Sequence, residues 1–501
     1  MNVKSLLAKP FALYIYSKIQ KDARQALATQ DAILQNLIKN GRKTVFGRGH
    51  KLDDVNTYDE YRNAVPIRSY EDFRPYLTKI KQGKHNILWK GQPLYLAKTS
   101  GTTSGVKYIP ISKDSIDNHI DTARNALLCY IAETGNNKFT AGKMIFLSGT
   151  PTLERVGGIP TGRLSGIVNH HVPRYLRPNQ LPTFETNCME DWEAKLEKIV
   201  DETIKEDMTL ISGIPPWMQM YFDRLQARSH KNIQELFPNF SVLVHGGVNF
   251  EPYKAKLFES IGKTVDTIDT FPASEGFFAF QDSQKAEGLL LNTNSGIFFE
   301  FIPADEVFDK NPTRIPLKDV KQGINYALII NSNAGLWGYN IGDTIKFVSL
   351  NPYRIVVTGR ISHFISAFGE HVIGEEVEQS LMKAAKQDQV NITEFTVAPH
   401  VKTLNGEKPY HEWFIEFENI PDDLERFALK VDHHLREKNI YYNDLLTGNI
   451  LQPLKIIPVR KNGFIDYMKS AGKLGGQNKL PRLSNDRKIA ESMLPYSIQH
   501  V

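Results

Sequence analysis

The sequence predicts an α/β fold. We expect a large N-terminal domain with mostly parallel sheets flanked by helices and a small β-barrel-like subdomain, followed by a smaller α+β C-terminal domain. Three observations predict this. Short apolar β-type runs alternate with helical stretches from about residue 140 to 360. Strands without long helices between them fill about residues 288–358, and the pattern changes after Gly359. The 501 residues allow two to four domains at about 150 residues each.

The N-terminal residues predict ordinary helices rather than a signal peptide. The best candidate for an apolar targeting segment, Phe11 to Tyr16, is far shorter than the ~20 residues that a membrane helix needs. Charged residues follow it closely. We therefore expect no membrane partner and a cytoplasmic location. The expected buried positions of these helices are Leu6, Leu7, Leu13, Ala32, Ile33, Leu34 and Leu37.

Four apolar runs predict strands of a parallel sheet: residues 144–147, 208–211, 242–245 and 265–270. Each is followed by small or turn-forming residues, and residues 192–205 carry apolar side chains at helical spacing. Such alternation is typical of a parallel sheet covered by helices. Because the carboxyl ends of parallel strands meet at one edge, we expect functional residues in the turns that follow them.

The rest of the chain predicts two further patterns. Strands are expected at residues 289–291, 298–302, 326–330, 344–348 and 354–357, which suggests an antiparallel sheet or small barrel. The C-terminal part predicts a compact α+β unit. Its elements are helices at residues 374–386 and near 421–437, with strands at 395–398, 413–417 and 454–459. Residues 470–486 are rich in Gly, Lys and Asn and predict an exposed loop.

Charge and cysteine content exclude several classes of protein. Lys and Arg number 61 and Asp and Glu number 56, so the net charge is only 61 − 56 = +5. Basic and acidic residues are interleaved, which gives no support for a nucleic-acid partner. Cys129 and Cys188 are the only cysteines, so neither a disulfide framework nor a zinc pattern exists. This cysteine content fits a reducing compartment.

The segment from Leu96 to Pro110 contains the pattern Thr-Ser-Gly-Thr-Thr-Ser-Gly-Val-Lys. Glycines let backbone N–H groups converge on an anion, hydroxyls add donors, and Lys107 adds charge, so the segment suits a triphosphate. It is not a Walker loop, because Tyr108 rather than Ser or Thr follows the lysine. A flexible linker is the alternative, but apolar strand-like residues flank the segment on both sides.

This segment resembles the phosphate loop of adenylate-forming enzymes, Thr/Ser-Ser-Gly-Thr-Thr-Gly-x-Pro-Lys-Gly. The inserted Ser104 and the Ile109-Pro110 pair resemble the auxin-responsive Gretchen Hagen three family of acyl-acid amido synthetases, in its bacterial branch. The resemblance implies that ATP phosphates lie against the loop and that Thr102 is catalytic. The implied phosphate-binding residues are Ser100, Gly101, Thr102, Thr103, Ser104, Gly105 and Lys107.

Asp269-Thr-Phe-Pro-Ala-Ser-Glu-Gly276 resembles a second motif of the family, Thr-Tyr-x-Ser-Ser-Glu. The resemblance implies that Phe271 lies against adenine. It also implies that Thr270 or Ser274 faces the α-phosphate, with Ser274 catalytic, and that Glu275 holds Mg²⁺. A carboxylate is a ligand that Mg²⁺ prefers beside phosphate oxygens.

Two further motifs occur in family order. Tyr339-Asn-Ile-Gly-Asp343 resembles the family's Tyr-x-x-Gly-Asp, which implies that Asp343 accepts hydrogen bonds from the ribose hydroxyls. Gly246-Gly247-Val248 resembles the small-residue turn whose backbone approaches adenine. A plain tight turn is the alternative for this second motif.

Residues 358–372 resemble the hinge between the two domains, with Arg360 contacting ribose or phosphate and the pivot among residues 361–363. The segment that ends in Gln-Asn-Lys479-Leu-Pro-Arg resembles the family's C-terminal tail. The resemblance implies a mobile C-terminal domain whose Lys479 enters the active site, with Lys473 as the alternative. A lysine there adds a point charge as negative charge develops at the phosphate.

The resemblance implies an ATP-dependent and Mg²⁺-dependent ligase, a monomer or weak dimer, which activates a carboxylic acid as an acyl-adenylate. It then transfers the acyl group to an amine, which we expect to be an amino acid. An acyl–coenzyme A ligase and a non-catalytic nucleotide-binding regulator are the alternatives. The acyl pocket stays open between residues 214–218, including Trp217 and Met218, and residues 169–174, including His170, His171 and Arg174. We expect His433 and His434 to be structural and to point to different faces of their helix.

Overall fold

The computed structural model describes residues 3–100, 106–174, 176–361, 364–365, 370, 372–401, 408–447, 450–474, 480–484 and 486–498. These residues form two compact units. The first comprises residues 1–248, 260–341 and 345–357, and the second comprises residues 249–259, 342–344 and 358–501. The second unit therefore takes in two short segments of the N-terminal part of the chain. The change of pattern after Gly359 predicts a functional division into an ATP- and acyl-acid-binding domain of residues 1–359 and a C-terminal cap domain of residues 360–501. This functional division stays a prediction.

Helices open the first unit, as predicted. They are α1 (Val3–Arg24), α2 (Ala26–Gly41), α3 (Val45–Gly49), α4 (Tyr58–Ala64) and α5 (Tyr70–Lys81). Capping boxes begin α4 at Thr57 and α5 at Ser69. The predicted positions Leu6 and Leu7 lie outside the residues whose side chains are described. Leu34 and Leu37 are buried as expected, but Leu13 is 48% exposed and Ala32 is also exposed. The prediction was wrong for these two because they lie on the solvent side of their helices.

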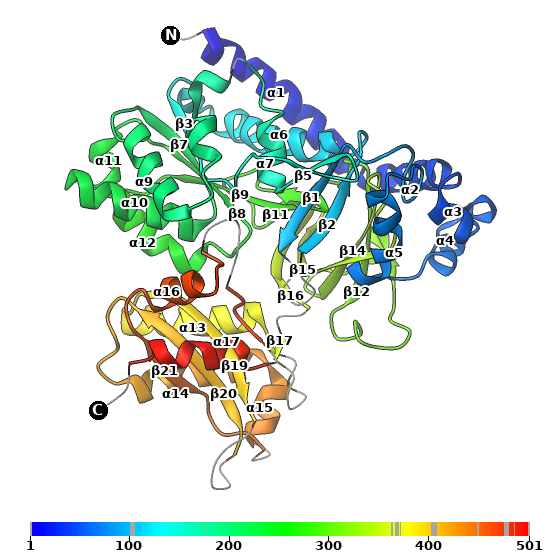
Figure 1. Ribbon diagram of the computed structural model, residues 1–501. Helices are drawn as coiled ribbons and strands as arrows, with labels where there is room; N and C mark the ends of the chain where they lie inside the picture. Colours follow the sequence, from blue (N-terminus) through cyan, green and yellow to red (C-terminus); the bar gives the residue numbers. More distant parts are fainter. Residues whose placement is uncertain are drawn as a thin grey trace. The chain divides into compact units, whose positions relative to one another are not determined.

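A twelve-stranded sheet forms the centre of this unit among the described residues (Figure 1). Its parallel half has the order β9 (Asp266–Ala273), β8 (Val242–Gly246), β7 (Met208–Gly213), β3 (Lys143–Phe146) and β6 (Gln180–Leu181). The four predicted parallel strands are thus confirmed. Their carboxyl ends share one edge, which is where the predicted site residues of this half occur.

The antiparallel half continues the same sheet. Its order is β10 (Gly276–Phe280), β11 (Leu289–Leu291), β16 (Tyr353–Arg360), β15 (Tyr339–Leu350), β14 (Asn325–Ser332), β12 (Ile297–Pro303) and β13 (Ile315–Pro316). The predicted antiparallel strands are confirmed, and their hydrogen bonding continues from the parallel half through β9 and β10. A smaller sheet has the order β2 (Val106–Ile111), β1 (Tyr95–Ser100), β5 (Ile159–Gly162) and β4 (Glu154–Val156).

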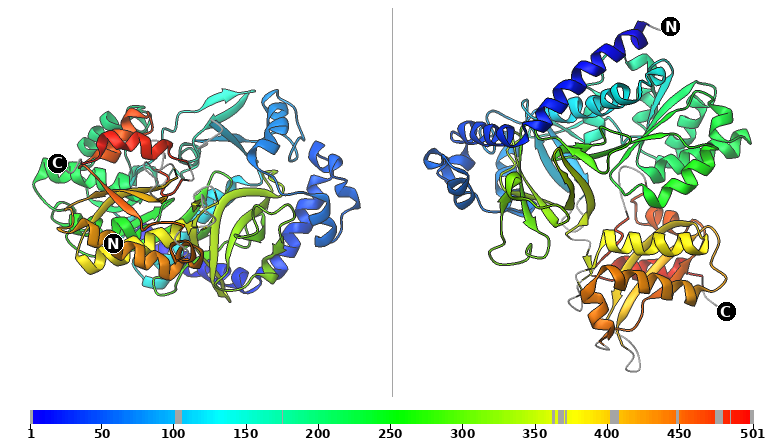
Figure 2. Two further views of the ribbon diagram at one scale, coloured as in Figure 1. Left: turned by 90° about the horizontal axis from the view of Figure 1, so that it is seen from below. Right: turned by 180° about the vertical axis from the view of Figure 1, so that it is seen from behind.

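Helices pack against the parallel half of the sheet (Figures 1 and 2). Helix α6 (Ile116–Thr134) packs on β9 and β10, and α1 lies along α6. Helix α9 (Trp192–Thr203) packs beside β6, and α10 (Pro215–Ser229) packs on β7. Helix α9 confirms the helix predicted at residues 192–205. Shorter helices are α7 (Leu164–Asn169), α8 (Phe184–Asn187) and α11 (Ile233–Leu236).

The second unit has a three-stranded sheet of β19 (Ile392–His400), β20 (Tyr410–Phe417) and β21 (Lys455–Val459). Its helices are α13 (Gly374–Asp388), α14 (Leu424–Lys438), α15 (Ile440–Thr447), α16 (Gly463–Ser470) and α17 (Lys488–Met493). Helix α12 (Glu251–Ile261) also belongs to this unit, except for its last two residues. Strands β17 (Phe364–Ile365) and β18 (Val372–Ile373) form a separate pair. All predicted C-terminal helices and strands are confirmed.

The prediction of an exposed loop at residues 470–486 is wrong for the described C-terminal part of this segment. Leu483 is fully buried in the core of the second unit, and the backbone of Arg482 and Ser484 bonds to Val397 of β19. The glycines and lysines earlier in the segment suggested exposure for the whole. A strand-like backbone pairing holds its last residues instead.

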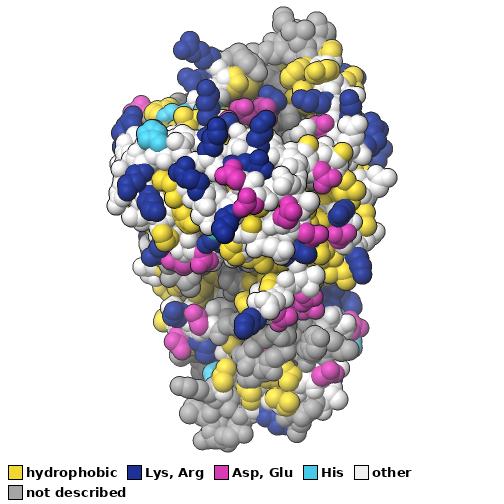
Figure 3. Space-filling view, turned by 90° about the vertical axis from the view of Figure 1, so that its right-hand side faces the viewer, with side chains coloured by type: hydrophobic (Ala, Val, Ile, Leu, Met, Phe, Trp, Pro, Cys, Tyr) yellow, Lys and Arg dark blue, Asp and Glu magenta, His cyan; other side chains and the backbone are white. Residues whose placement is uncertain are grey.

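No helix among the described residues is long and apolar enough to span a membrane. On the face shown in Figure 3, basic and acidic side chains are interspersed over much of the surface. This distribution agrees with the small net charge of +5.

Candidate active site

The predicted phosphate loop joins two paired strands. In β1 and β2, Thr99 pairs with Lys107 and Ser100 pairs with Val106. Gly101, Thr102, Thr103, Ser104 and Gly105 lie outside the described residues, so their predicted contacts to phosphate stay predictions. The buried residues Ala97 and Ile109 on either side belong to the core, which supports an anchored loop rather than a linker.

Lys107 is held beside helix α5. Its side-chain nitrogen lies 5.4 Å from the ring centroid of Tyr70, and the Tyr70 hydroxyl accepts a hydrogen bond of 2.9 Å from the backbone N–H of Tyr108. A cation over an aromatic ring gains modest electrostatic attraction. Helix α5 therefore fixes the strand that carries the predicted phosphate-binding lysine.

Gly246 and Gly247 form the turn after β8, next to the following strand. A Cβ atom on Gly246 would lie 2.4 Å from the carbonyl oxygen of Thr270, and Gly247 has a φ of +81°. Both positions therefore require glycine. The Thr270 hydroxyl donates a hydrogen bond of 2.7 Å to the carbonyl of His245. Val248 is half-buried at the end of this turn.

Ser274 and Glu275 are the two central residues of a tight hairpin, since Ala273 of β9 pairs with Gly276 of β10. The Tyr339 hydroxyl donates a hydrogen bond of 3.4 Å to Oε1 of Glu275. Among the described residues, no hydrogen bond engages the Ser274 hydroxyl, whereas that of Thr270 is already used as a donor. Of the two predicted α-phosphate donors, this geometry favours Ser274.

Phe271 is buried and makes its ring contact with the core. Its ring meets that of Phe278 edge to face, with centroids 5.2 Å apart. This packing explains an apolar residue at the position and fixes β9 against β10. The predicted contact of Phe271 with adenine stays a prediction.

Asp343 and Arg360 are brought together within the second unit. The Arg360 Nε atom donates a hydrogen bond of 2.8 Å to Oδ1 of Asp343. Gly342 precedes Asp343 with a φ of +85°, and its carbonyl accepts a 2.7 Å hydrogen bond from the backbone N–H of Ile361. The glycine of Tyr-x-x-Gly-Asp therefore permits a backbone turn that binds the first hinge residue. The remaining pivot candidates, residues 362–363, lie outside the described part.

The predicted catalytic Lys479 lies outside the described residues, and its alternative Lys473 is exposed three residues after the end of α16. Arg482, three residues after Lys479, is firmly fixed in the second unit. Its guanidinium forms a 2.5 Å ion pair with Glu394 and donates a 2.6 Å hydrogen bond to the Tyr253 hydroxyl. Burial alone lowers the pKa of Arg482, but the contacts with Glu394 and Tyr253 outweigh burial and raise it, so the guanidinium stays charged. The segment with the predicted lysine is thus anchored on its C-terminal side.

The side chain of Asn118 in α6 hydrogen-bonds to the backbone of the hairpin that carries Glu275. Its side chain accepts a 2.7 Å hydrogen bond from the backbone N–H of Phe277 and donates a 3.1 Å bond to the carbonyl of the same residue. An amide that satisfies both backbone groups fixes the strand two residues after Glu275. Sequence reasoning missed this residue, since a lone asparagine in a helix carries no recognisable signal.

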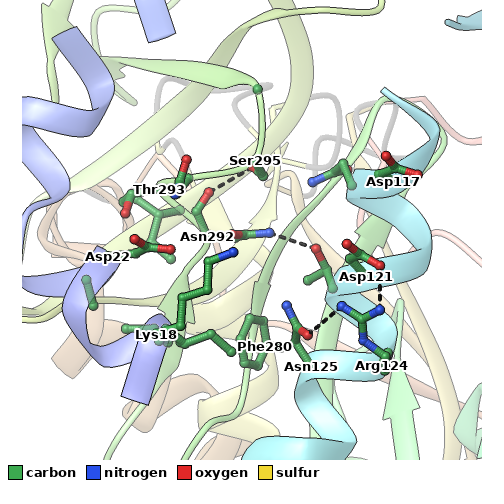
Figure 4. Close-up of a pocket in the computed structure, with 18 of the residues that line it drawn as sticks. Lys18, Asp22, Asp117, Asp121, Arg124, Asn125, Phe280, Asn292, Thr293 and Ser295 are labelled. Carbon is green, nitrogen blue, oxygen red and sulfur yellow. Dashed lines mark hydrogen bonds and ion pairs between the residues drawn. The ribbon is translucent and has the colours of Figure 1, made fainter. Parts of the chain in front are cut away.

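A cavity of about 310 Å³ lies between α1, α6 and residues 290–296 (Figure 4). Lys18 points its ammonium group into it, and Asp121 and Arg124 form a 2.9 Å ion pair on its α6 side. None of the predicted site residues lines this cavity. We therefore do not assign it to the nucleotide.

The residues considered for the acyl pocket have mostly structural contacts. Met218 is fully buried and Trp217 packs on Trp192, with ring centroids 4.5 Å apart. His170 is 2.8 Å from the carbonyl oxygen of Pro151 and His171 is 3.1 Å from the Tyr95 hydroxyl. Arg174 is exposed.

His433 and His434 both reach the same carboxylate, at 3.4 Å and 3.1 Å from Glu437. The prediction that they point to different faces was therefore wrong in part: one ring is exposed and the other buried, but the helix turn brings both to Glu437. Lys383 lies 2.9 Å from the same carboxylate and lowers the pKa of Glu437 to about 2. This ion-pair cluster accounts for the two histidines in structural terms.

Comparison with solved structures defines the class of fold. The chain resembles a GH3.15 acyl acid amido synthetase with a TM-score of 0.80 at 15% identity, over 97% of this chain and 96% of that one. It also resembles a 2-hydroxyisobutyryl-CoA ligase in the postadenylation state, with a TM-score of 0.60 at 12% identity, over 93% and 90% of the two chains. The fold is that of the adenylate-forming ligases, which confirms the predicted fold class.

The chain belongs to the GH3 family. The model of the GH3 family N-terminal domain matches residues 15–187 and 164–265, the central domain residues 290–360, and the C-terminal domain residues 375–488. A probable indole-3-acetic acid-amido synthetase of Arabidopsis thaliana is 22% identical over 94% of this chain and 92% of its own length. A jasmonoyl–L-amino acid synthetase of Nicotiana attenuata is 21% identical over 66% and 68%. The resemblance predicted from the motifs is confirmed.

Proposed function

We propose that this protein is an ATP-dependent acyl-acid amido synthetase. The observation that carries the proposal is the hydrogen bond between Tyr339 and Glu275. It joins two family motifs that lie 64 residues apart in the chain, in a protein that belongs to the GH3 family. Amido synthetases among its relatives support the same activity.

In the first step, a carboxylate oxygen of the acid attacks the α-phosphorus of ATP. A new O–P bond forms, the bond to the pyrophosphate oxygen breaks, and an acyl-adenylate results. Ser274 and the loop residues hold the α-phosphate, and Lys479 neutralises negative charge that develops there. The chemistry needs no side-chain nucleophile, only positioning and charge neutralisation.

In the second step, an amine attacks the carbonyl carbon of the adenylate. The C–N bond forms, the C–O bond to AMP breaks, and the amine loses its proton. We propose an amino acid as the amine, in line with the names of the relatives. Between the two steps, the C-terminal domain is proposed to rotate about residues 360–363, from the conformation that forms the adenylate to the conformation that forms the amide.

The residues at the hairpin fit Mg²⁺. Glu275 offers a half-buried carboxylate at a tight turn, and one of its oxygens already accepts a bond from Tyr339, which orients the other. When bound, Mg²⁺ neutralises charge on the triphosphate. The ribose is proposed to bind Asp343, with Arg360 holding the carboxylate in place.

The proposal is tested by ATP–pyrophosphate exchange across a panel of carboxylic acids. Acid-dependent exchange is expected, and amide is expected when amino acids are added. If no acid of the panel supports exchange, the result contradicts the proposed adenylation. Thioester formation with coenzyme A, without amide, favours the acyl-CoA ligase that shares the fold. Lys479→Ala is expected to slow exchange while leaving ATP binding intact, whereas an effect of Lys473→Ala alone moves the role to that lysine.

A further inference from the structure

Two basic side chains, the buried Lys195 and the half-buried Arg163, lie near the carboxyl end of β3 and have no carboxylate partner among the described residues. Lys195 of α9 is 2% exposed, and its ammonium donates 2.9 Å hydrogen bonds to the carbonyls of Ser148 and Asn187. Ser148 lies two residues after the end of β3. Among the described residues, Lys195 forms no ion pair. Burial, with a smaller contribution from the nearby Arg163, lowers the pKa of Lys195 to about 8.

Arg163 lies at the same strand end. A Cβ atom on Gly149 would lie 2.7 Å from Cδ of Arg163, so the arginine crosses directly over this glycine. Its guanidinium is half-buried, and within the described part of the chain neither a hydrogen bond nor an ion pair engages it. An arginine has five N–H donors, and it is rarely buried unpaired.

Two neutral donors nearby are also unsatisfied. Asn187 is fully buried and Trp192 is 6% exposed, yet Nδ2 of Asn187 and Nε1 of Trp192 have no acceptor among the described residues. Trp192 and Lys195 lie three residues apart on α9 and so share a helix face. Buried donors without acceptors are costly and call for an explanation. Two cations and the Asn187 amide therefore lie near one strand end, and Trp192 lies on the same helix face as Lys195.

The position relates these donors to the proposed active site. In the parallel half, β3 is separated from β8 only by β7. Neighbouring strands are about 4.8 Å apart, so Ser148 lies about 10 Å along the sheet edge from Gly246, where the nucleotide is proposed to bind. An acid that extended along this edge from a reacting carboxylate at the α-phosphate would approach Arg163.

We propose that Arg163, Lys195 and Asn187 form a subsite for a second anionic group on the acyl substrate, so that the preferred acid is a dicarboxylic acid. The proposal rests on the proposed function, because it places the reacting carboxylate at the adenylation site. A second carboxylate supplies acceptors for the unpaired guanidinium and amide, and it balances the two positive charges. A purely apolar acid leaves these groups unpaired.

The test compares acids of matched length, adipate with hexanoate and suberate with octanoate, by ATP–pyrophosphate exchange. We expect kcat/KM for at least one diacid to exceed that of its monoacid partner by tenfold or more. Arg163→Met is expected to remove this preference while changing the monoacid value less than threefold, and Arg163→Lys to restore part of it. The control is Arg155→Met, since Arg155 is exposed and, among the described residues, its side chain bonds only to the Gly158 carbonyl. A monoacid preference in the native enzyme overturns the proposal.

Binding of the diacid is measured separately by calorimetry in the absence of ATP. Saturable binding of suberate that weakens at least tenfold in Arg163→Met supports the subsite even if exchange fails, in which case only the proposed function is lost. Equal binding to the native protein and to Arg163→Met overturns the subsite, even if exchange with monoacids succeeds. Far-ultraviolet circular dichroism confirms that the variants are folded.

Discussion

Replacement of Asp343 by Asn tests the proposed ribose contact most sharply. The carboxylate accepts one hydrogen bond from Arg360 through Oδ1, and among the described residues Oδ2 has no donor. The free oxygen is therefore available for a ribose hydroxyl. Asn keeps the shape but loses the charge and one acceptor.

The magnitude follows from the contacts. A hydrogen bond to a charged group contributes about 1.5–3 kcal/mol. At 1.36 kcal/mol per tenfold, its loss raises the Kd of ATP about 10- to 150-fold. The effect on folding is expected to be small, since the Arg360 side chain is 45% exposed and such ion pairs contribute about 0–1 kcal/mol.

The assay is calorimetric titration with a non-hydrolysable ATP analogue and its 2′-deoxy form. The native protein is expected to bind the ribose form more tightly, and Asp343→Asn is expected to lose most of this discrimination. Asp305→Asn, at an exposed position of the first unit, serves as the control and is expected to bind as the native protein does. A Kd for the analogue within threefold of the native value, with the ribose preference retained, refutes the assignment.

Three further predictions concern stability. Gly246→Ala places a methyl group 2.4 Å from a β9 carbonyl and is expected to lower the free energy of unfolding in urea by about 1–3 kcal/mol. Gly49→Ala, where no atom lies within 4 Å, is expected to change this free energy by less than about 1 kcal/mol. Equal effects of the two substitutions contradict the reasoning. Glu300→Gln leaves Arg314 buried without its carboxylate and is expected to cost about 3–5 kcal/mol, and a loss below about 1 kcal/mol in the same assay shows that the pair is not needed. Burial lowers the pKa of His119 from 6.5 to about 4, so as the pH falls the unfolded chain binds a proton at this histidine before the folded protein does. The contribution of the neutral histidine to the free energy of unfolding is therefore complete above pH 6.5 and is lost as the pH falls toward 4. His119→Leu is expected to reduce the loss of stability between pH 7.5 and pH 4.5 by about 2.5 kcal/mol, and an unchanged pH dependence excludes His119 as the titrating group.

Local patterns predicted most elements of the fold. Each parallel strand is a short apolar run that ends at small residues, and the hairpin with Glu275 lies where the strand at residues 265–270 was expected to end. These features depend on neighbouring residues, so one chain suffices to predict them. The family motifs added the site residues, of which the structure joins Glu275 to Tyr339 and Asp343 to Arg360.

The parts of the fold and of the site that the sequence did not predict depend on contacts between segments that are far apart in the chain. Asn118 binds the backbone of Phe277, 159 residues away, and Arg163 lies near Lys195 only because α7 and α9 begin close to the end of β3. Leu483 is buried although its segment is polar, because it pairs with β19. No periodicity within a single window carries this information, since it arises from tertiary packing.

The central claim is that the acid is activated as an acyl-adenylate, and an oxygen-isotope experiment tests it most directly. The acid is labelled with ¹⁸O in its carboxylate, incubated with ATP, Mg²⁺ and the amino acid, and the products are analysed by mass spectrometry. Attack on the α-phosphorus followed by amide formation predicts that AMP carries one ¹⁸O atom from the acid. Label in inorganic phosphate, with ADP as the nucleotide product, contradicts the account, because it shows attack at the γ-phosphorus.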